Sequence, residues 1–309
     1  MEYIFERVSA KHYKDLVYLF QQSFNEKIEI GYYESKFNTA YTGFTHLGYV
    51  AYAPDKTIAA FYGVFPYPIN HNGKIIVAGQ SGDTMTHPNH TGKGLFTILA
   101  KMTYDLCKEE GIAFIFGFPN QNSYPGFVRK LNWIHKENIQ QYDWRILTLP
   151  LAGLAKKFSF LQSFYEWYVR NFITFFFQKS ENFPNSSCAN EKLFVEHSEP
   201  FIEYKKFYGS RLIKVDGIRM WVNIKGALLV GDIEISNHKL DNVLSALKKV
   251  AFYLGCSKIV FMASPDTALD IFLRTNLSPK EGLPIGYLDL SSGIDLSLLK
   301  FCYADFDTF

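Results

Sequence analysis

Apolar and polar positions in the first half of the chain predict a strand, two helices and then three further strands. Residues 3–8 alternate as a strand does, and after Ser9 the apolar residues recur at helical spacing. A second amphipathic stretch follows at about residues 32–41. Three strand-like runs come next, and Asn72-Gly73 predicts a hairpin between the second and the third. These runs cover residues 48–53, 57–71 and 74–87.

The third run leads through a turn marked by Pro88 into a glycine-containing loop that opens a helix. The first N–H groups of a helix have no partner within it and favour an anion, and glycine lets an anion approach the backbone closely. Helical spacing continues over residues 95–110, Gly111 is a C-cap candidate, and a buried strand is expected at residues 112–118. The expected pyrophosphate loop comprises Thr91, Gly92, Lys93, Gly94, Leu95 and Phe96.

The spacing of this loop excludes two common phosphate motifs. It is neither the G-x-G-x-x-G of dinucleotide-binding folds nor the G-x-x-x-x-G-K-[ST] of P-loops. A turn that merely starts a helix remains the alternative to a phosphate site.

The loop in its context resembles that of the GNAT superfamily of N-acetyltransferases, which has the form [QR]-x-x-G-x-[GA] after a strand and a turn. Gly94 occupies the central glycine position, whereas Thr91 and Phe96 depart from the pattern. Downstream, Lys130, Leu131 and Trp133 match the family's Y-x-K-x-G-F ending, with Asn132 in place of its glycine. The resemblance covers about residues 1–147. It implies an α/β (α+β) fold with a mixed, mostly antiparallel sheet flanked by helices.

The resemblance also implies roles for residues around the loop. A main-chain amide within Thr84, Met85 and Thr86 would hold the thioester carbonyl, with Met85 or Thr86 preferred. Tyr124 would protonate the leaving thiolate, or pack at the rim of the site. Asn120 and Asn122 would bind the pantetheine arm, or cap the helix at residues 123–131.

Two carboxylates are candidates for the general base. Asp83 lies on the strand before the loop and points either towards the acceptor or to solvent. The terminal carboxylate of Phe309 is the second candidate, because tandem GNAT proteins of the enhanced-intracellular-survival type place the terminal carboxylate in the active site. A frayed terminus is the alternative. Glu26, Glu29, Tyr32 and Tyr33, from the first helical hairpin, are expected near the acceptor.

The second half repeats the order of elements of the first. We expect a GNAT acyl-CoA-binding domain at 1–150, an aromatic helical linker at 151–187 and a degenerate GNAT-like domain at 188–309. In this second domain only Asn237, His238 and Lys239 separate the strand from the helix, so it should lack a phosphate loop.

Composition narrows the possible partners. The 309 residues carry a formal charge of +2, which gives no long-range attraction to nucleic acid. Four dispersed cysteines indicate neither a metal site nor a disulfide framework, and the start of the chain lacks a signal-peptide pattern, so a cytoplasmic protein is expected. Charged residues interrupt the aromatic segment 151–183, so no transmembrane segment is expected, while peripheral membrane contact stays possible.

The sequence therefore predicts an acyl-CoA-dependent N-acyltransferase that uses acetyl-CoA as co-substrate. It would act on a small or medium primary amine, such as an amino sugar or amino-acid derivative, by direct transfer in a ternary complex. The alternatives are a non-catalytic acyl-CoA-binding or interaction module, and a tRNA-dependent aminoacyl transferase of the peptidoglycan-bridge type. The near-neutral charge counts against the last of these, since tRNA binding depends on phosphate neutralisation.

Overall fold

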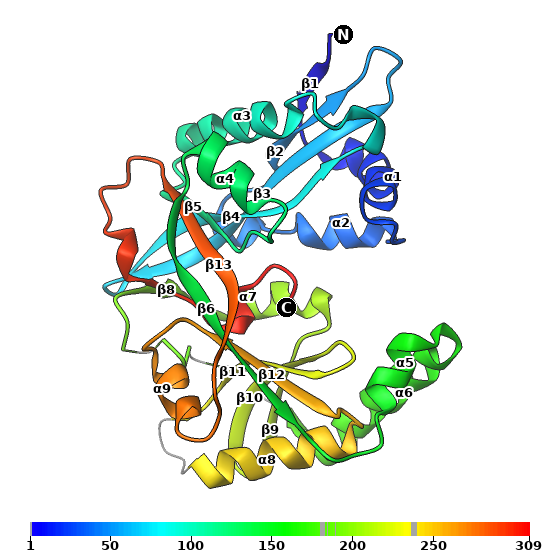
Figure 1. Ribbon diagram of the computed structural model, residues 1–309, viewed down its shortest axis with the longest axis vertical. Helices are drawn as coiled ribbons and strands as arrows, with labels where there is room; N and C mark the ends of the chain where they lie inside the picture. The colour runs from blue at the N-terminus through cyan, green and yellow to red at the C-terminus, as the bar shows by residue number, and fades with distance from the viewer. Residues whose placement is uncertain (1, 180–182, 184, 189, 236–239) are drawn as a thin grey trace. The chain divides into compact units, whose positions relative to one another are not determined.

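The computed structural model describes residues 2–179, 183, 185–188, 190–235 and 240–309 (Figure 1). The chain forms two compact units. Unit 1 comprises Met1–Glu137 and Leu283–Ser297, and unit 2 comprises Asn138–Gly282 and Leu298–Phe309. This division differs from the expected boundaries at 150 and 187.

Unit 1 is built on a mixed sheet with the predicted order of elements. Strands β2, β3 and β4 form an antiparallel meander, β1 pairs with β2, and β5 lies parallel to β4 after the intervening helix α3. Asn72 and Gly73 both have positive φ, 51° and 82°, as the predicted hairpin turn requires. The strands are β1 (Ile4–Arg7), β2 (Leu47–Tyr52), β3 (Ile58–His71), β4 (Lys74–Thr86) and β5 (Phe114–Gly117); the helices are α1 (Tyr13–Phe24), α2 (Ile30–Lys36), α3 (Leu95–Glu110) and α4 (Tyr124–Leu131).

Helices cover both faces of this sheet (Figure 1). The apolar stripe of α3 buries Leu95 and Leu99 in a core that also contains Val64 of β3. On the other face, α1 and α2 pack aromatic rings, with Phe37 directly after α2 contacting Phe65 of β3 at a centroid distance of 5.3 Å. Each face of β3 is therefore buried, which explains its nearly continuous run of apolar residues.

Unit 2 contains the remaining helices and strands, except that the start of β6 and the larger part of β13 belong to unit 1. The strands are β6 (Ile134–Arg145), β7 (Gln178–Lys179), β8 (Leu193–Val195), β9 (Arg211–Val215), β10 (Ile218–Ile224), β11 (Leu228–Ile233), β12 (Lys258–Ala263), β13 (Lys280–Asp289) and β14 (Leu299–Lys300); the helices are α5 (Leu151–Lys157), α6 (Ser159–Phe176), α7 (Glu199–Lys205), α8 (Leu240–Tyr253) and α9 (Ala268–Arg274).

The central elements of unit 2 repeat those of unit 1. Strands β9, β10 and β11 form an antiparallel meander, and β12 lies parallel to β11 after helix α8. This order confirms the predicted GNAT-like arrangement of the second half. The predicted absence of a phosphate loop there concerns Asn237, His238 and Lys239, which lie outside the described residues.

Two long strands, β6 and β13, each begin in one unit and end in the other, which accounts for the discontinuous boundaries of the units. Strand β6 begins in unit 1, and its residues 140–145 pair with β12 of unit 2. Strand β13 begins in unit 2, and its residues 286–289 pair antiparallel with β5 of unit 1. Each unit thus completes its sheet with a strand from a distant part of the sequence.

The aromatic segment expected as a linker forms α5 and α6 within unit 2. Val169 and Ile173 of α6 lie in the core of this unit, together with Ala152 of α5. Within the described part of the chain, no helix combines the length and the hydropathy needed to cross a membrane.

Candidate functional site

The predicted phosphate loop is an exposed backbone turn at the start of α3. A short 3-10 turn at Pro88–His90 connects β4 to the loop, and residues 91–94 are all exposed. Gly92 and Gly94 have φ of +73° and +78°, and a Cβ atom at either position would meet nothing within 4 Å. The glycines are therefore needed for backbone conformation, and the space in front of them is open.

The loop presents a set of unused backbone donors. Gly94 is the N-cap of α3, and its carbonyl accepts from the N–H groups of Thr97 and Ile98. In the described part of the chain, no protein acceptor is recorded for the N–H groups of residues 92–96. A row of free N–H groups at the positive end of a 16-residue helix is an anion-binding arrangement.

Phe96 departs from the small residue of the GNAT pattern, but its side chain does not block the loop. The ring turns inwards, 5.3 Å from the ring of Phe127 on α4 and 5.9 Å from that of Tyr62 on β3. It also lies against Gly126, where an added Cβ would come within 2.9 Å of the ring. Phe96 therefore ties the first turn of α3 to the first turn of α4 and leaves residues 91–94 exposed.

This contact brings Tyr124 into the neighbourhood of the loop. Tyr124 is the first residue of α4, two positions before Gly126, and its half-buried ring meets His135 edge-on at 5.7 Å. Among the described residues, no hydrogen-bond partner is recorded for its hydroxyl group. The hydroxyl is therefore available to a ligand.

The side chain of Asn120 serves the turn into α4. Its Oδ1 accepts from the N–H groups of Asn122 and Ser123, at 3.0 and 3.1 Å. Asn120 therefore caps the start of α4, which is the alternative to its predicted contact with the pantetheine arm. Asn122 is exposed, and its pantetheine role stays a prediction.

Strand β4 is irregular where the thioester carbonyl is expected. Its register against β3 shifts between Phe61 and Gly63, and Asp83 has a positive φ of 48°. The pairing of β4 with β5 covers only Gly79 and Gln80, so β4 runs on to Thr86 beyond it.

Beyond that point the edge of β4 offers a backbone donor. The N–H group of His87 donates to Ala59 of β3 at 2.8 Å, and successive N–H groups of a strand point to opposite edges. The Thr86 N–H is therefore directed away from β3, which favours Thr86 over Met85. The side chain of Met85 is buried, and Tyr33 donates to its Sδ at 3.7 Å. Thr84 is half-buried at the irregularity.

Asp83 lies in a nearly buried ion pair that sequence reasoning missed. Its Oδ1 is 2.7 Å from the Nζ of Lys36, and the two side chains are 11% and 1% exposed. Tyr32 donates to the carboxylate at 3.3 Å, and Lys36 also donates to the Tyr32 hydroxyl at 3.1 Å. Of the four residues expected near the acceptor, Tyr32 thus contacts the candidate base. Tyr33 is buried, and Glu26 and Glu29 are exposed.

Lys36→Ala is expected to lower the free energy of unfolding by about 3 kcal/mol, because it leaves the Asp83 carboxylate in a nearly buried position without its ammonium partner. The control is Lys11→Ala, whose ion pair with Glu6 is exposed and should contribute less than about 1 kcal/mol. Urea denaturation of both variants measures the difference. Equal losses would show that the Lys36 pair is energetically an ordinary surface pair.

A chain of hydroxyl groups leads from the core to β4 and was also not foreseen. Trp133 donates to the Tyr104 hydroxyl at 2.9 Å, Tyr104 lies 2.8 Å from Tyr62, and Tyr62 lies 2.7 Å from Ser81. Burial raises the pKa of both tyrosines, so they stay neutral hydrogen-bonding groups. Ser81 directly follows the last β4 residue paired with β5, so this chain fixes the strand where the site begins.

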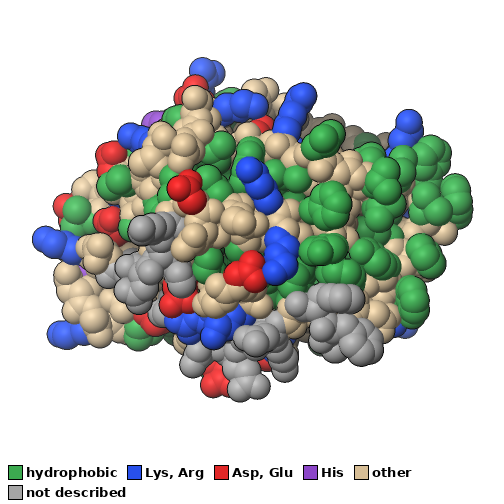
Figure 2. All heavy atoms as spheres, turned by 90° about the horizontal axis from the view of Figure 1, so that it is seen from below, with side chains coloured by type: hydrophobic (Ala, Val, Ile, Leu, Met, Phe, Trp, Pro, Cys, Tyr) green, Lys and Arg blue, Asp and Glu red, His purple; other side chains and the backbone are tan. Residues whose placement is uncertain are grey.

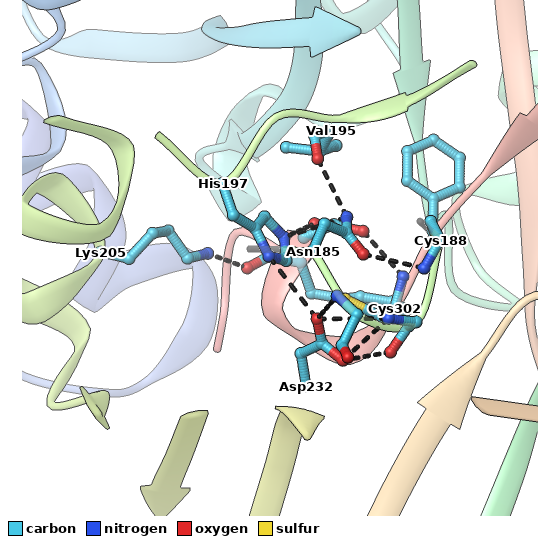
Figure 3. Close-up of polar contacts among 12 residues, drawn as sticks. Asn185, Cys188, Val195, His197, Lys205, Asp232 and Cys302 are labelled. Atoms are coloured by element: carbon cyan, nitrogen blue, oxygen red, sulfur yellow. Dashed lines mark hydrogen bonds and ion pairs between the residues drawn. The ribbon is translucent and has the colours of Figure 1, made fainter. Parts of the chain in front are cut away.

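Unit 2 contains a second polar cluster, formed around the buried ring of His197 (Figure 3). His197 Nε2 lies 2.9 Å from Asp305 Oδ1, and its Nδ1 lies 3.8 Å from Asp232 Oδ2. Burial raises the pKa of Asp232 to about 6. The nearby His197 acts in the opposite direction and lowers this pKa, as do the hydrogen bonds that the carboxylate accepts from Ser186, Ser187 and Ile233.

The ligand atoms of His197, Cys302 and Asp305 all lie within 4.8 Å of one another, close enough to consider a metal ion. However, Cys302 and Asp305 already form a reciprocal capping box, and Asp305 also contacts His197. We therefore assign this cluster a structural role, since protein contacts already use Cys302 and Asp305, while the buried Nδ1 of His197 makes no hydrogen bond to any described residue.

The cluster helps to fix the last residues of the chain. Lys205 donates to the carbonyl of Phe306, and the buried ring of Phe309 meets Trp221 at a centroid distance of 6.0 Å. Gly231 leaves room for that ring, since a Cβ there would clash with Phe309 Cζ. The side chain of Phe309 is thus anchored in unit 2, and the role of its carboxylate as a base stays a prediction.

Comparison with known proteins finds a family match within the first unit. Residues 5–135 match the acetyltransferase (GNAT) domain. No curated protein matches the sequence.

Several solved structures share the fold at low sequence identity. A GCN5-related N-acetyltransferase from Kribbella flavida is 11% identical, with 94% of this chain and 73% of that chain covered and a TM-score of 0.58. A putative acetyltransferase from Pyrococcus horikoshii is 13% identical, with coverage of 97% and 93% and a TM-score of 0.57. The N-myristoyltransferase of Saccharomyces cerevisiae, solved with bound myristoyl-CoA, is 11% identical, with coverage of 93% and 82% and a TM-score of 0.59.

Proposed function

Because residues 5–135 match the acetyltransferase (GNAT) domain, we propose that the protein transfers an acyl group from acyl-CoA, with acetyl-CoA as the donor, to a primary amine. The observation that carries the proposal is the row of N–H groups from Gly92 to Phe96, which have no acceptor among the described residues and begin at an exposed loop. These groups would bind the pyrophosphate of coenzyme A. The acceptor is a small or medium amine, such as an amino sugar or amino-acid derivative.

The proposed reaction is direct transfer within a ternary complex. The amine nitrogen attacks the thioester carbonyl, the C–S bond breaks, and the amine loses a proton while the thiolate gains one. The N–H of Thr86 would hold the carbonyl oxygen, where negative charge develops. The hydroxyl of Tyr124 would supply the proton to the thiolate. No cysteine is needed in this scheme, and Cys107 of unit 1 is buried with its pKa raised to about 12 by that burial.

Asp83 is the candidate base within unit 1, and its ion pair allows a controlled test. Asp83→Asn should lower turnover at least about 100-fold if the carboxylate accepts the amine proton. Lys36→Ala breaks the same ion pair but keeps the carboxylate, so the folded fraction of this variant should retain most of its turnover. Steady-state rates, corrected for the folded fraction, show whether Asp83 is the general base. Equal rates in the two variants would limit Asp83 to a structural role and leave the Phe309 carboxylate as the remaining candidate.

Two experiments separate this proposal from its alternatives. Acetyl-CoA at 100 times its Kd should stabilise the protein by about 2.7 kcal/mol, and release of free thiol with a panel of primary amines should then identify a catalyst. Stabilisation without thiol release would favour a non-catalytic acyl-CoA-binding module. If millimolar acetyl-CoA gave no stabilisation, the proposal would fail. Transfer from a charged tRNA, which the near-neutral charge disfavours, would appear as aminoacyl transfer to a peptidoglycan precursor.

A further inference from the structure

Unit 2 carries a large exposed apolar surface on α5, α6 and the end of α8. More than half of the exposed large hydrophobic residues in the described part of the chain belong to it. Figure 2 shows hydrophobic side chains gathered over one end of the view. We call it the aromatic surface, and it consists of Leu147, Leu149, Leu151, Leu154, Phe158, Phe160, Phe164, Trp167, Phe252 and Tyr253.

Helix α6 is apolar on two faces, unlike an ordinary surface helix. Its inner face buries Val169 and Ile173 in the core of unit 2. Its outer face presents Phe160, Phe164 and Trp167, which are 77%, 67% and 53% exposed. These three residues are spaced by four and three positions and so form one stripe along the helix. Folding of unit 2 accounts for the inner face only.

The exposed side chains belong to one continuous, fixed surface. Tyr165 and Tyr168 of α6 donate to the carbonyls of Leu254 and Tyr253 at the end of α8, at 2.7 and 2.5 Å. Thr148 donates to the carbonyl of Phe252 at 3.0 Å, which holds the segment of Leu147 and Leu149 against the same helix end. Hydrogen bonds therefore connect α6, residues 147–149 and the end of α8, which carry the apolar side chains.

The charge around the surface points to an anionic partner. Residues 145–173 contain four basic residues and one acidic residue, whereas the whole chain carries only +2, so its positive excess lies in this segment. Lys156 and Lys157 are both exposed, and the Lys157 ammonium lies 5.5 Å from the ring of Phe158. The acidic residue, Glu166, accepts a hydrogen bond from Gln162 at 2.9 Å.

We propose that the aromatic surface docks the protein on a membrane that contains anionic lipid. Phenylalanine, leucine and tryptophan side chains would enter the boundary between headgroups and acyl chains, and the lysines would contact anionic headgroups. Such a helix lies in the membrane interface and does not span the bilayer, in agreement with the hydropathy of α6. The proposal does not depend on the acyl-transfer activity.

Flotation with lipid vesicles tests this proposal. The full-length protein should bind vesicles of phosphatidylcholine with about 30% phosphatidylglycerol, and binding should weaken in neutral vesicles and at high salt. The double variant Phe164→Ser/Trp167→Ser should reduce binding at least about tenfold, through lost apolar insertion. Lys156→Glu/Lys157→Glu should reduce it at least about 25-fold, on the basis of a factor of about five for each charge removed. Ile75→Ser, at a residue of unit 1 that is 55% exposed, is the matched control and should bind as the wild type does.

Fluorescence of Trp167 provides a readout specific to this surface. Trp133 and Trp221 are buried and Trp144 is half-buried, so Trp167 is the tryptophan whose surroundings change most on docking. We expect quenching by brominated lipid, lost in Trp167→Phe. If wild-type protein did not bind anionic vesicles, or if Trp167 stayed unquenched in bound protein, the proposal would be overturned. Self-association that the serine variants abolish, without vesicle binding, would instead make this surface an interface between copies.

Discussion

Gly94→Asp is expected to reduce affinity for acyl-CoA by more than about 100-fold, a loss of roughly 2.7 kcal/mol or more. Gly94 has φ +78° and open space in front of it, so the new carboxylate would project from the loop and would not be buried. It would place negative charge at the site where the free N–H groups favour the pyrophosphate. Isothermal titration with acetyl-CoA, and with coenzyme A alone, measures the loss.

The control for this prediction is Gly73→Asp. Gly73 also has a positive φ, +82°, and a Cβ added there would meet nothing within 4 Å, but it lies in the hairpin between β3 and β4. Both variants therefore introduce the same charge and a similar backbone strain. We expect similar losses of stability and a loss of affinity in Gly94→Asp alone. Unchanged affinity in Gly94→Asp would show that the loop does not bind the cofactor.

Signals confined to neighbouring residues were read correctly from the sequence. The turn at Pro88, the glycines at 92 and 94, the helix from Leu95 and its end at Gly111 all appear in the structure as predicted. Each depends on a local requirement, namely a positive φ, a cap or a helical stripe. The repeated order of strands and helix in the second half was likewise visible in the pattern.

Contacts between distant residues could not be foreseen in the same way. The ion pair of Lys36 with Asp83 joins a helix to a strand irregularity, and His197 meets Asp305 across 108 positions. The pairing of β6 with β12 and of β13 with β5 also has no local signal, because the hydrophobic pattern of a strand does not show which strand it pairs with. The sequence also could not show how Phe96 fits in place of the small residue of the GNAT pattern, because the space for its ring depends on Gly126 of another helix.

Tyr124→Phe is expected to lower kcat about 100-fold while leaving the affinity for acetyl-CoA unchanged. If the Tyr124 hydroxyl protonates the leaving thiolate, its loss affects the transition state and not the bound ground state. In the described part of the chain no protein partner is recorded for this hydroxyl, and the ring contact with His135 is kept in the variant. The unfolding temperature should therefore stay the same, which separates a chemical role from a structural one.

The matched control is Tyr18→Phe, which removes a hydroxyl from an exposed tyrosine on α1 and should leave kcat unchanged. Single-turnover release of coenzyme A isolates the chemical step from product release. There the Tyr124→Phe rate should fall by the same factor as kcat if proton transfer to the thiolate limits the reaction. A normal single-turnover rate with a raised KM would instead make Tyr124 a residue that positions the donor.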